Sequence, residues 1–185
     1  MVLEPEEVRR RLGARDRATP DGDGRPAAVL VPLVFHPSGL RVVLTRRSLT
    51  LRHHRGQWSF PGGARDSKDR DFAATALREA HEEIGLEPSV VTVLGCLDDH
   101  LTISSYKVTP VVGRVPPGYG YRLSPSEVTH LEEFPVAAFL GPVTELPVAV
   151  EPELVRHVPA VRVGDHVVWG TTLRMLLQLV AVLGG

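Results

Sequence analysis

The sequence predicts a mixed α/β fold in which a β-sheet lies between helices. Three observations lead to this class. Apolar, strand-like runs occur on both sides of one central helix, a second amphipathic helix closes the sequence, and strict alternation of strand and helix is absent. Such an order favours a mixed sheet over a purely parallel one. The 185 residues match the usual size of one domain. We therefore expect a single domain over residues 1–185, with residues 1–25 forming an N-terminal helix and loop.

The first third of the chain predicts a helix, a loop and a β-hairpin. Residues 4–12 have the mixed charge of a short surface helix, and residues 13–26 are rich in Gly, Asp, Arg and Pro, which is typical of a loop. Residues 27–35 are almost continuously apolar and predict a buried strand. Pro32 counts against a central, fully paired position for that strand, which leaves a bulge or a free edge. A second strand over residues 40–47 would complete an antiparallel hairpin.

A helix follows a short predicted strand around Trp58–Phe60. Its apolar residues recur at helical intervals, as expected for one face packed on a core: Ala73, Ala76, Leu77, Ala80 and Ile84. Asp69 or Asp71 would cap its start, and Gly85 is placed to end it.

The second half of the chain predicts more strands and a closing helix. Residues 141–153 are Pro-rich and weakly patterned. The expected strands cover residues 90–97, 106–115 and 127–136 and a pair within 155–169 that turns at Gly164–Asp165; the expected helix covers residues 170–183.

Composition narrows the classes of function. The formal net charge of −1 and the pI near 6.7 argue against a nucleic-acid or membrane binder. Cys96 is the single cysteine, which excludes a disulfide framework or a cysteine metal site within the chain and fits a reducing compartment. The N-terminus lacks the apolar run of a signal peptide. We therefore expect a cytoplasmic protein with a small-molecule substrate, and the oligomeric state stays open.

Three glutamates in the central helix point to a metal site. Glu79, Glu82 and Glu83 stand at i, i+3 and i+4 and share one helix face, with only Arg78 close enough along the helix to offset their repulsion. This face lies beside the apolar stripe, near the rim of the core, where attraction to a cation is less screened. A solvated helix face is the alternative. The Gly62–Gly63 pair before the helix favours the metal site, because bare backbone can approach a ligand and offer a carbonyl.

The same stretch resembles the Nudix box of the Nudix hydrolase family. Residues 78–86, Arg-Glu-Ala-His-Glu-Glu-Ile-Gly-Leu, match its second half in full. The first half departs from the pattern. Counted from Gly63, the acid position falls on Asp69 instead of a glutamate, and one extra residue separates it from Arg78, so the role of Asp69 stays open.

A basic segment, residues 44–63, precedes the box. It contains four arginines and two histidines and no acid. A charged surface loop in an Arg-rich chain is one interpretation. However, its spacing resembles a signature of the coenzyme A pyrophosphatase branch of the family, which also carries Asp near the position of Asp69. The matching residues are Leu44, Thr45, Arg47, Ser48, Arg52, Gly56, Phe60, Pro61, Gly62 and Gly63. Residues 1–25 and 140–165 lie outside the resemblance.

The resemblance implies a Nudix fold, an α/β/α sandwich around a mixed sheet, and hydrolysis of coenzyme A to adenosine 3′,5′-bisphosphate and 4′-phosphopantetheine. It implies Mg²⁺ or Mn²⁺ as cofactor, and it assigns roles to particular residues. The metal ligands would be Glu79, Glu82, Glu83 and the Gly63 carbonyl; the catalytic residues would be Glu82 or Glu83 as proton acceptor and Arg78 as orienting group; the substrate-binding residues would be Arg46, Arg47, Arg52, His53 and Phe60.

The sequence leaves alternatives open for several residues and for the substrate. Glu127 would complete the metal site, act as a base or form a structural ion pair. Trp58 and Tyr106 would stack on an adenine or pack in the core. The substrate would otherwise be another nucleoside diphosphate derivative, such as ADP-ribose or a dinucleotide, or the domain would be a non-catalytic nucleotide sensor.

Overall fold

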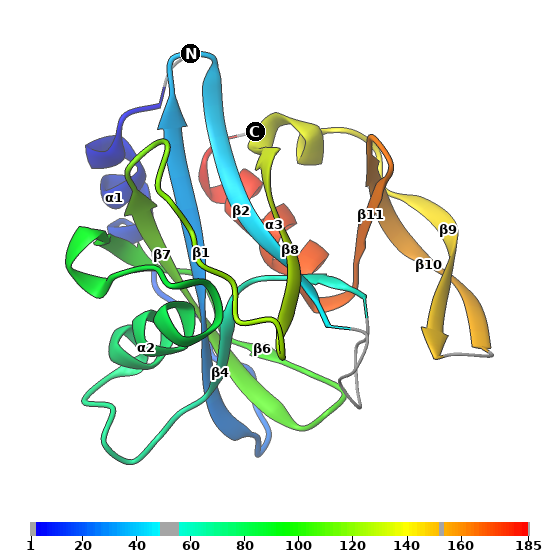
Figure 1. Cartoon of the computed structure of the whole chain (residues 1–185), viewed down its shortest axis with the longest axis horizontal. Helices are drawn as coiled ribbons and strands as arrows, with labels where there is room; N and C mark the ends of the chain where they lie inside the picture. The colour runs from blue at the N-terminus through cyan, green and yellow to red at the C-terminus, as the bar shows by residue number, and fades with distance from the viewer. Residues whose placement is uncertain (1–2, 49–55, 152–153, 185) are drawn as a thin grey trace.

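The computed structural model describes residues 3–48, 56–151 and 154–184, and Figure 1 shows how the elements are arranged. The helices are α1 (Pro5–Gly13), α2 (Phe72–Ile84) and α3 (Gly170–Val182), with 3₁₀ turns η1 (Pro88–Val90) and η2 (Val136–Leu140). The strands are β1 (Arg25–His36), β2 (Gly39–Arg47), β3 (Trp58–Ser59), β4 (Gly62–Ala64), β5 (Thr92–Cys96), β6 (His100–Leu101), β7 (Tyr106–Val115), β8 (Val128–Pro135), β9 (Thr144–Glu151), β10 (Leu154–Val163) and β11 (His166–Trp169).

The main sheet is mixed, as the sequence predicts. Its central order is β3-β2-β1-β7-β5, with β4 paired to β1, β6 to β7 and β8 to β2. The β1–β7 ladder is parallel over ten residue pairs, from Arg25 with Tyr106 to Val34 with Val115. The other ladders of this sheet are antiparallel. The hairpin of β1 and β2 is confirmed.

Apolar side chains cover both faces of the main sheet. One cluster joins the sheet to α2, through Ala76, Ala80 and Ile84. The other joins the opposite face to α1 and α3, through Val8 of α1 and Leu176 and other residues of α3. Helices therefore lie on both sides of the sheet (Figure 1). Among the described residues, no helix combines the length and the apolar character that crossing a bilayer requires.

The expectation for Pro32 is wrong in part: β1 is a central strand with no free edge, but it has no strand partner at Pro32 on one of its two sides. Pro32 aligns with Gly113 in the parallel ladder. The backbone N–H of Leu30, two residues earlier, donates to Pro61 on the opposite side of β1. Alternation along a strand turns the nitrogen of Pro32 to that same side, between the β4 ladder, which ends at Val29, and the β2 ladder, which begins at Leu33. The missing donor thus falls in a gap between two partners.

The region 141–153, which is weakly patterned in the sequence, contains the strand β9. There β9 pairs antiparallel with β10, and β10 pairs with β11, to form a second, three-stranded sheet. Pro147 aligns with His157 in the edge strand, where a missing backbone donor is tolerated. Pairing with β10 stabilises β9 as a strand, although its weak apolar pattern does not predict one. In Figure 1 the β9–β10 ribbon extends to the right of the main sheet.

The ends of α2 follow local rules. Asp71 is the N-cap, and its carboxylate accepts a hydrogen bond of 2.7 Å from the backbone N–H of Ala74. Gly85 ends the helix in the left-handed region at φ 64°, with its N–H bonded to the His81 carbonyl. The cap is therefore Asp71 and not Asp69, which leaves Asp69 available for another contact.

Candidate active site

Two glycines let the backbone of β4 pack closely against β1 and α2. In β4, Gly63 pairs with Ala28 of β1. A Cβ atom added at Gly63 would lie 2.6 Å from the Glu79 carboxylate, and one added at Gly62, where φ is 159°, would lie 2.4 Å from the carbonyl oxygen of Ala28. Both positions are closed to any larger residue, so the backbone at Gly63 lies directly beside a glutamate of the box.

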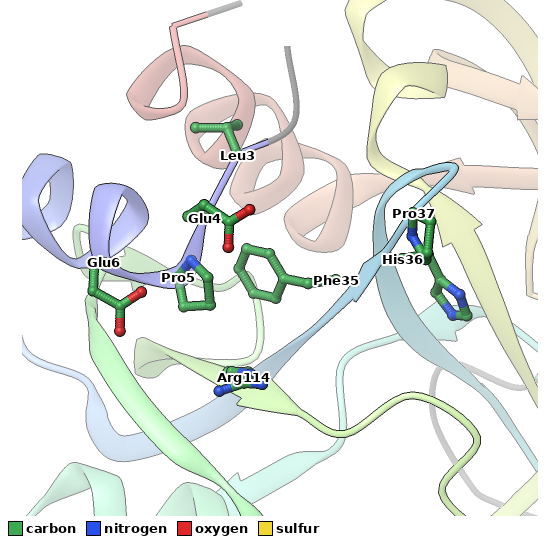
Figure 2. A pocket seen from close by; sticks show the side chains of 8 residues that line it. All are labelled: Leu3, Glu4, Pro5, Glu6, Phe35, His36, Pro37 and Arg114. Atoms are coloured by element: carbon green, nitrogen blue, oxygen red, sulfur yellow. The ribbon is translucent and has the colours of Figure 1, made fainter.

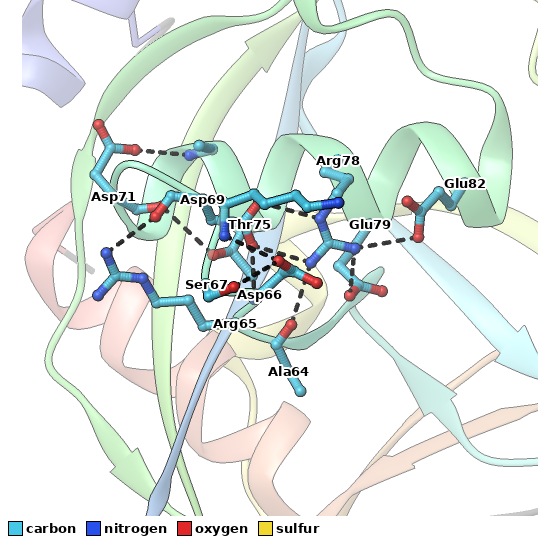
Figure 3. Close-up of polar contacts among 12 residues, drawn as sticks. Ala64, Arg65, Asp66, Ser67, Asp69, Asp71, Thr75, Arg78, Glu79 and Glu82 are labelled. Carbon is cyan, nitrogen blue, oxygen red and sulfur yellow. Dashed lines mark hydrogen bonds and ion pairs between the residues drawn. The ribbon is translucent and has the colours of Figure 1, made fainter.

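Arg78 is the centre of the polar contacts on this face of α2 (Figure 3). Its Nη1 donates to Glu79 at 2.9 Å and to Glu82 at 3.2 Å, and its Nη2 donates to the Ala64 carbonyl at 3.1 Å. Its Nε and Nη2 donate to the two carboxylate oxygens of Asp69. The guanidinium group thus orients two box glutamates and ties α2 to β4.

Asp69 is held as the partner of Arg78. Its carboxylate is buried and also accepts a hydrogen bond of 2.9 Å from the backbone N–H of Asp66. The hydrogen bonds from Arg78 are the main reason that the pKa of Asp69 is lowered to about 2. The structure therefore places Asp69 behind Arg78, where it positions the guanidinium group.

Glu83 is the most buried of the three box glutamates, at 4% exposed. Its pKa is raised to about 8, chiefly because burial withdraws the carboxyl group from water. The positive charge of Arg47 and a hydrogen bond from the Gly62 backbone oppose this shift, and the charges of Glu127 and Glu79 add to it. A buried acid with acidic neighbours is poorly neutralised by the protein alone.

Glu79 and Glu82 differ from each other in exposure. Burial raises the pKa of Glu79, whereas the Glu82 side chain is 52% exposed and reaches Arg78 from the solvent side. Across the described residues, no three His, Cys, Asp or Glu side chains converge on one point in the arrangement of a metal site. The helix face is shared, but the carboxylate groups themselves are spread over it.

The chemistry of this donor set nevertheless fits a hard divalent cation. The carboxylate oxygens are of the type that Mg²⁺ and Mn²⁺ prefer. Burial and the like charges of Glu79, Glu83 and Glu127 all penalise ionisation without a counter-charge. A cation between them would relieve that cost, and the Gly63 backbone is close enough to Glu79 to contribute its carbonyl.

Glu127 lies next to this cluster, immediately before β8. Its charge acts on both Glu79 and Glu83. Its backbone carbonyl accepts a hydrogen bond from Ser48, which anchors the start of β8 to the end of β2. No cationic side chain forms an ion pair with Glu127 within the described part of the chain. Its place is therefore beside the glutamates of the box.

A cleft of about 880 Å³ opens beside Gly62 and Gly63. Its walls come from β1, β3, β4 and β7 of the main sheet, and from β10 and the beginning of α3. Arg47 and Phe60 line it, and Arg47 also acts on the charge of Glu83. Gly62, Gly63 and Arg47 border both the cleft and the glutamates, so the two adjoin each other, and no described glutamate lines the cleft itself.

The expected substrate-binding residues separate into three groups. Arg47 and Phe60 line the cleft. Arg46 does not, because neighbouring residues of a strand face opposite sides, and its guanidinium group donates instead to the Gly56 carbonyl. Arg52 and His53 lie outside the described residues, so their roles stay predictions.

The aromatic residues Trp58 and Tyr106 also line the cleft. Trp58 is buried and makes edge-to-face contacts with His130, Phe134 and His166. Trp58 therefore packs in the core where the core borders the cleft, and core packing is one of the two interpretations that the sequence left open.

Sequence reasoning missed the second wall of the cleft. Arg156 of β10 and Arg174 of α3 line it, and neither belongs to a motif. The sequence signal that could have indicated Arg156 is the alternation of side chains along its strand.

A separate hollow of about 380 Å³ lies at the other end of β1, between the chain before α1 and the turn after Phe35 (Figure 2). It contains no residue of the box.

Comparison with known proteins gives three results. A sequence model described as the NUDIX domain matches residues 24–155. A protein of Escherichia coli O1:K1 named "Uncharacterized Nudix hydrolase NudL" is 41% identical over 166 residues, which cover 86% of this chain and 83% of the relative. A protein of the same name from Shigella boydii serotype 18 matches equally well.

Solved structures share the fold. An Ap4A hydrolase from C. elegans aligns with a TM-score of 0.52 at 20% identity, over 60% of this chain and 80% of its own. A Nudix hydrolase from M. smegmatis, RenU, aligns with a TM-score of 0.53 at 24% identity, over 63% of this chain and 74% of its own. These likenesses confirm the fold class that the sequence predicts.

Proposed function

This chain belongs to the Nudix hydrolase family and has its fold, and we propose that it hydrolyses the diphosphate of coenzyme A to adenosine 3′,5′-bisphosphate and 4′-phosphopantetheine. Family membership supports hydrolysis of a nucleoside diphosphate derivative. The choice of coenzyme A is ours, and it rests on the basic segment before the box and on the cleft to which that segment contributes.

One observation carries the proposal: the cleft borders the glutamates at Gly62, Gly63 and Arg47, and its described lining contains three arginines and no acid. The rest of the lining is mainly apolar or uncharged. Such a surface suits a ligand that has several anionic groups together with an uncharged arm. Coenzyme A has this composition, with a diphosphate, a further phosphate and a long pantetheine arm.

The glutamates and Gly63 would hold the metal. We assign Glu79, Glu82, Glu83 and the Gly63 carbonyl to Mg²⁺ or Mn²⁺, with Arg78 orienting Glu79 and Glu82. When bound, the ion supplies neutralisation of the diphosphate and a lower pKa for the attacking water.

Glu83 is the better candidate for the proton acceptor. It is buried beside the cleft, whereas Glu82 is half exposed and engaged by Arg78. Arg47 lines the cleft and acts on the charge of Glu83, and it would bind the diphosphate oxygens.

The direct test uses coenzyme A and ADP-ribose in parallel. Purified protein is incubated with each compound and Mg²⁺ at mildly alkaline pH, and the products are identified by mass. We expect adenosine 3′,5′-bisphosphate and 4′-phosphopantetheine in the first reaction. Cleavage of ADP-ribose without cleavage of coenzyme A would overturn the substrate assignment, and binding of both without any cleavage would favour a nucleotide sensor.

A further inference from the structure

The C-terminal segment of the chain builds one wall of the cleft. The NUDIX domain match ends at residue 155, yet residues from 156 to 177 line the same cleft as Gly62 and Gly63. The lining from this segment includes Arg156 and Val158 on β10, and Thr171 and Arg174 at the beginning of α3. The wall of the cleft that β10 and α3 form is therefore built by residues beyond the matched domain.

Alternation along β10 decides which of its side chains face the cleft. Leu154, Arg156 and Val158 line it, together with Pro159, whereas Val155 and His157 do not. Successive side chains of a strand point to opposite faces, so from residue 155 to residue 158 the side chains of β10 alternate between the cleft and the other face. Arg156 is the charged member of an otherwise apolar row.

Arg174 presents a second guanidinium group from the facing helix. Its Nη2 donates to the Leu101 carbonyl and to the Thr171 hydroxyl group, both at 3.2 Å. These contacts fix the group at the edge of the cleft near residues 102–104, which also line it. Arginine carries five N–H donors, so two bonds from one nitrogen leave capacity for an anion.

The charges of the cleft fall into two sets. Arg47 acts on Glu83 and belongs to the end where the diphosphate would react. Arg156 and Arg174 lie on β10 and α3, away from the box elements, and no described acidic residue lines the cleft with them. Two guanidinium groups in an acid-free wall raise the local concentration of anions and suit a phosphate group.

We propose that Arg156 and Arg174 bind an anionic group of the substrate that lies beyond the scissile diphosphate, and that the C-terminal segment thereby selects the substrate. This inference rests on the proposed function. For coenzyme A the group is the 3′-phosphate of the adenosine, so the two arginines distinguish coenzyme A from its 3′-dephospho form. Both residues bind substrate and neither takes part in bond cleavage.

The test compares kcat/KM for coenzyme A and for 3′-dephospho-coenzyme A in the wild type and in Arg156→Ala. We expect Arg156→Ala to lose about tenfold in kcat/KM on coenzyme A, equivalent to about 1.4 kcal/mol, and to change little on the dephospho form. The loss should fall on KM. Arg156→Lys keeps the charge and should recover part of the preference. Arg174→Ala should act in the same direction.

Arg162→Ala is the matched control. Arg162 is an exposed arginine on the same strand that does not line the cleft, so its removal makes the same change in net charge. Equal losses on both substrates in Arg156→Ala, or an equal loss in Arg162→Ala, would overturn the inference while leaving the proposed function standing. Failure of the wild type to cleave either form of coenzyme A would instead count against the proposed function.

Discussion

The guanidinium group of Arg78 faces the carboxylate of Asp69 across two hydrogen bonds, of 3.1 Å from Nε and 3.0 Å from Nη2. Two parallel bonds of this kind fix the plane of the guanidinium group as well as its position. The remaining donors of Arg78 then reach Glu79 and Glu82. The residue that departs from the general Nudix pattern therefore organises the glutamates through Arg78.

Removal of the Asp69 charge should destabilise the protein and lower turnover. Asp69→Asn leaves a partly buried guanidinium group without its main partner, and we expect a loss of about 1–3 kcal/mol in the free energy of unfolding. Urea denaturation followed by circular dichroism measures it. Asp66→Asn is the control, because the Asp66 side chain is exposed and bonds only to its own turn among the described residues. Equal losses in both variants would contradict this role of Asp69.

The ion pair between Asp69 and Arg78 should make the free energy of unfolding depend on pH in the acid range. The pKa of Asp69 is about 2 in the folded protein and 3.8 ordinarily, so the folded state binds its proton less readily. The stabilisation is present above pH 3.8 and is lost as the pH falls through 2. Over this pH range we expect the free energy of unfolding to fall by about 1–2 kcal/mol. This is less than the shift in pKa alone would give, because the Arg78 side chain is 30% exposed and solvent screens the pair.

Urea midpoints between pH 5 and pH 2 measure this acid dependence. The wild type should lose more stability than Asp69→Asn over the range, so the two curves should converge at low pH. Parallel curves would show that the pair contributes nothing that depends on the charge of Asp69.

Glu83 should be needed for turnover and for stabilisation by metal. Glu83→Gln keeps the shape of the side chain and removes its charge, so we expect about 10³-fold lower kcat with the fold intact. Mg²⁺ at about 100 times its dissociation constant should stabilise the wild type by about 2.7 kcal/mol, and a chelator should reverse it. Thermal unfolding with and without Mg²⁺ checks this.

Glu87→Gln is the control for Glu83, since it lies past the end of α2 with its side chain 49% exposed and removes one acid from the same region. It should keep both activity and the response to Mg²⁺. Wild-type activity in Glu83→Gln would exclude the buried carboxylate from the reaction.

Gly63→Ala should damage the site through packing alone. Its methyl group would lie 2.6 Å from the Glu79 carboxylate, so that side chain or β4 must move. We expect at least about tenfold lower kcat/KM, because small displacements of a metal ligand cost catalysis. Gly120→Ala is the control, since a Cβ there meets no atom within 4 Å. Full activity in Gly63→Ala would show that close approach is not required at Gly63.

The sequence predicts those features that depend on local geometry. The helical period alone places Glu79, Glu82 and Glu83 on one face, and Gly85 ends α2 where its conformational freedom predicts. Most elements of the main sheet follow from apolar runs and turns. β9 could not be predicted in this way, because its pattern is weak and its pairing with β10 depends on a partner elsewhere in the chain.

Tertiary structure decides what each of these residues experiences. Glu82 and Glu83 are neighbours of identical chemistry, yet one is half exposed and the other is buried with a raised pKa, because packing of α2 on the sheet closes only one side of the helix. The pairing of Asp69 with Arg78 and the entry of Arg156 into the cleft likewise join separated segments. Burial and charge proximity are properties of the packed chain, so the sequence by itself determined which groups are candidates for the chemistry, and the fold decided their environment.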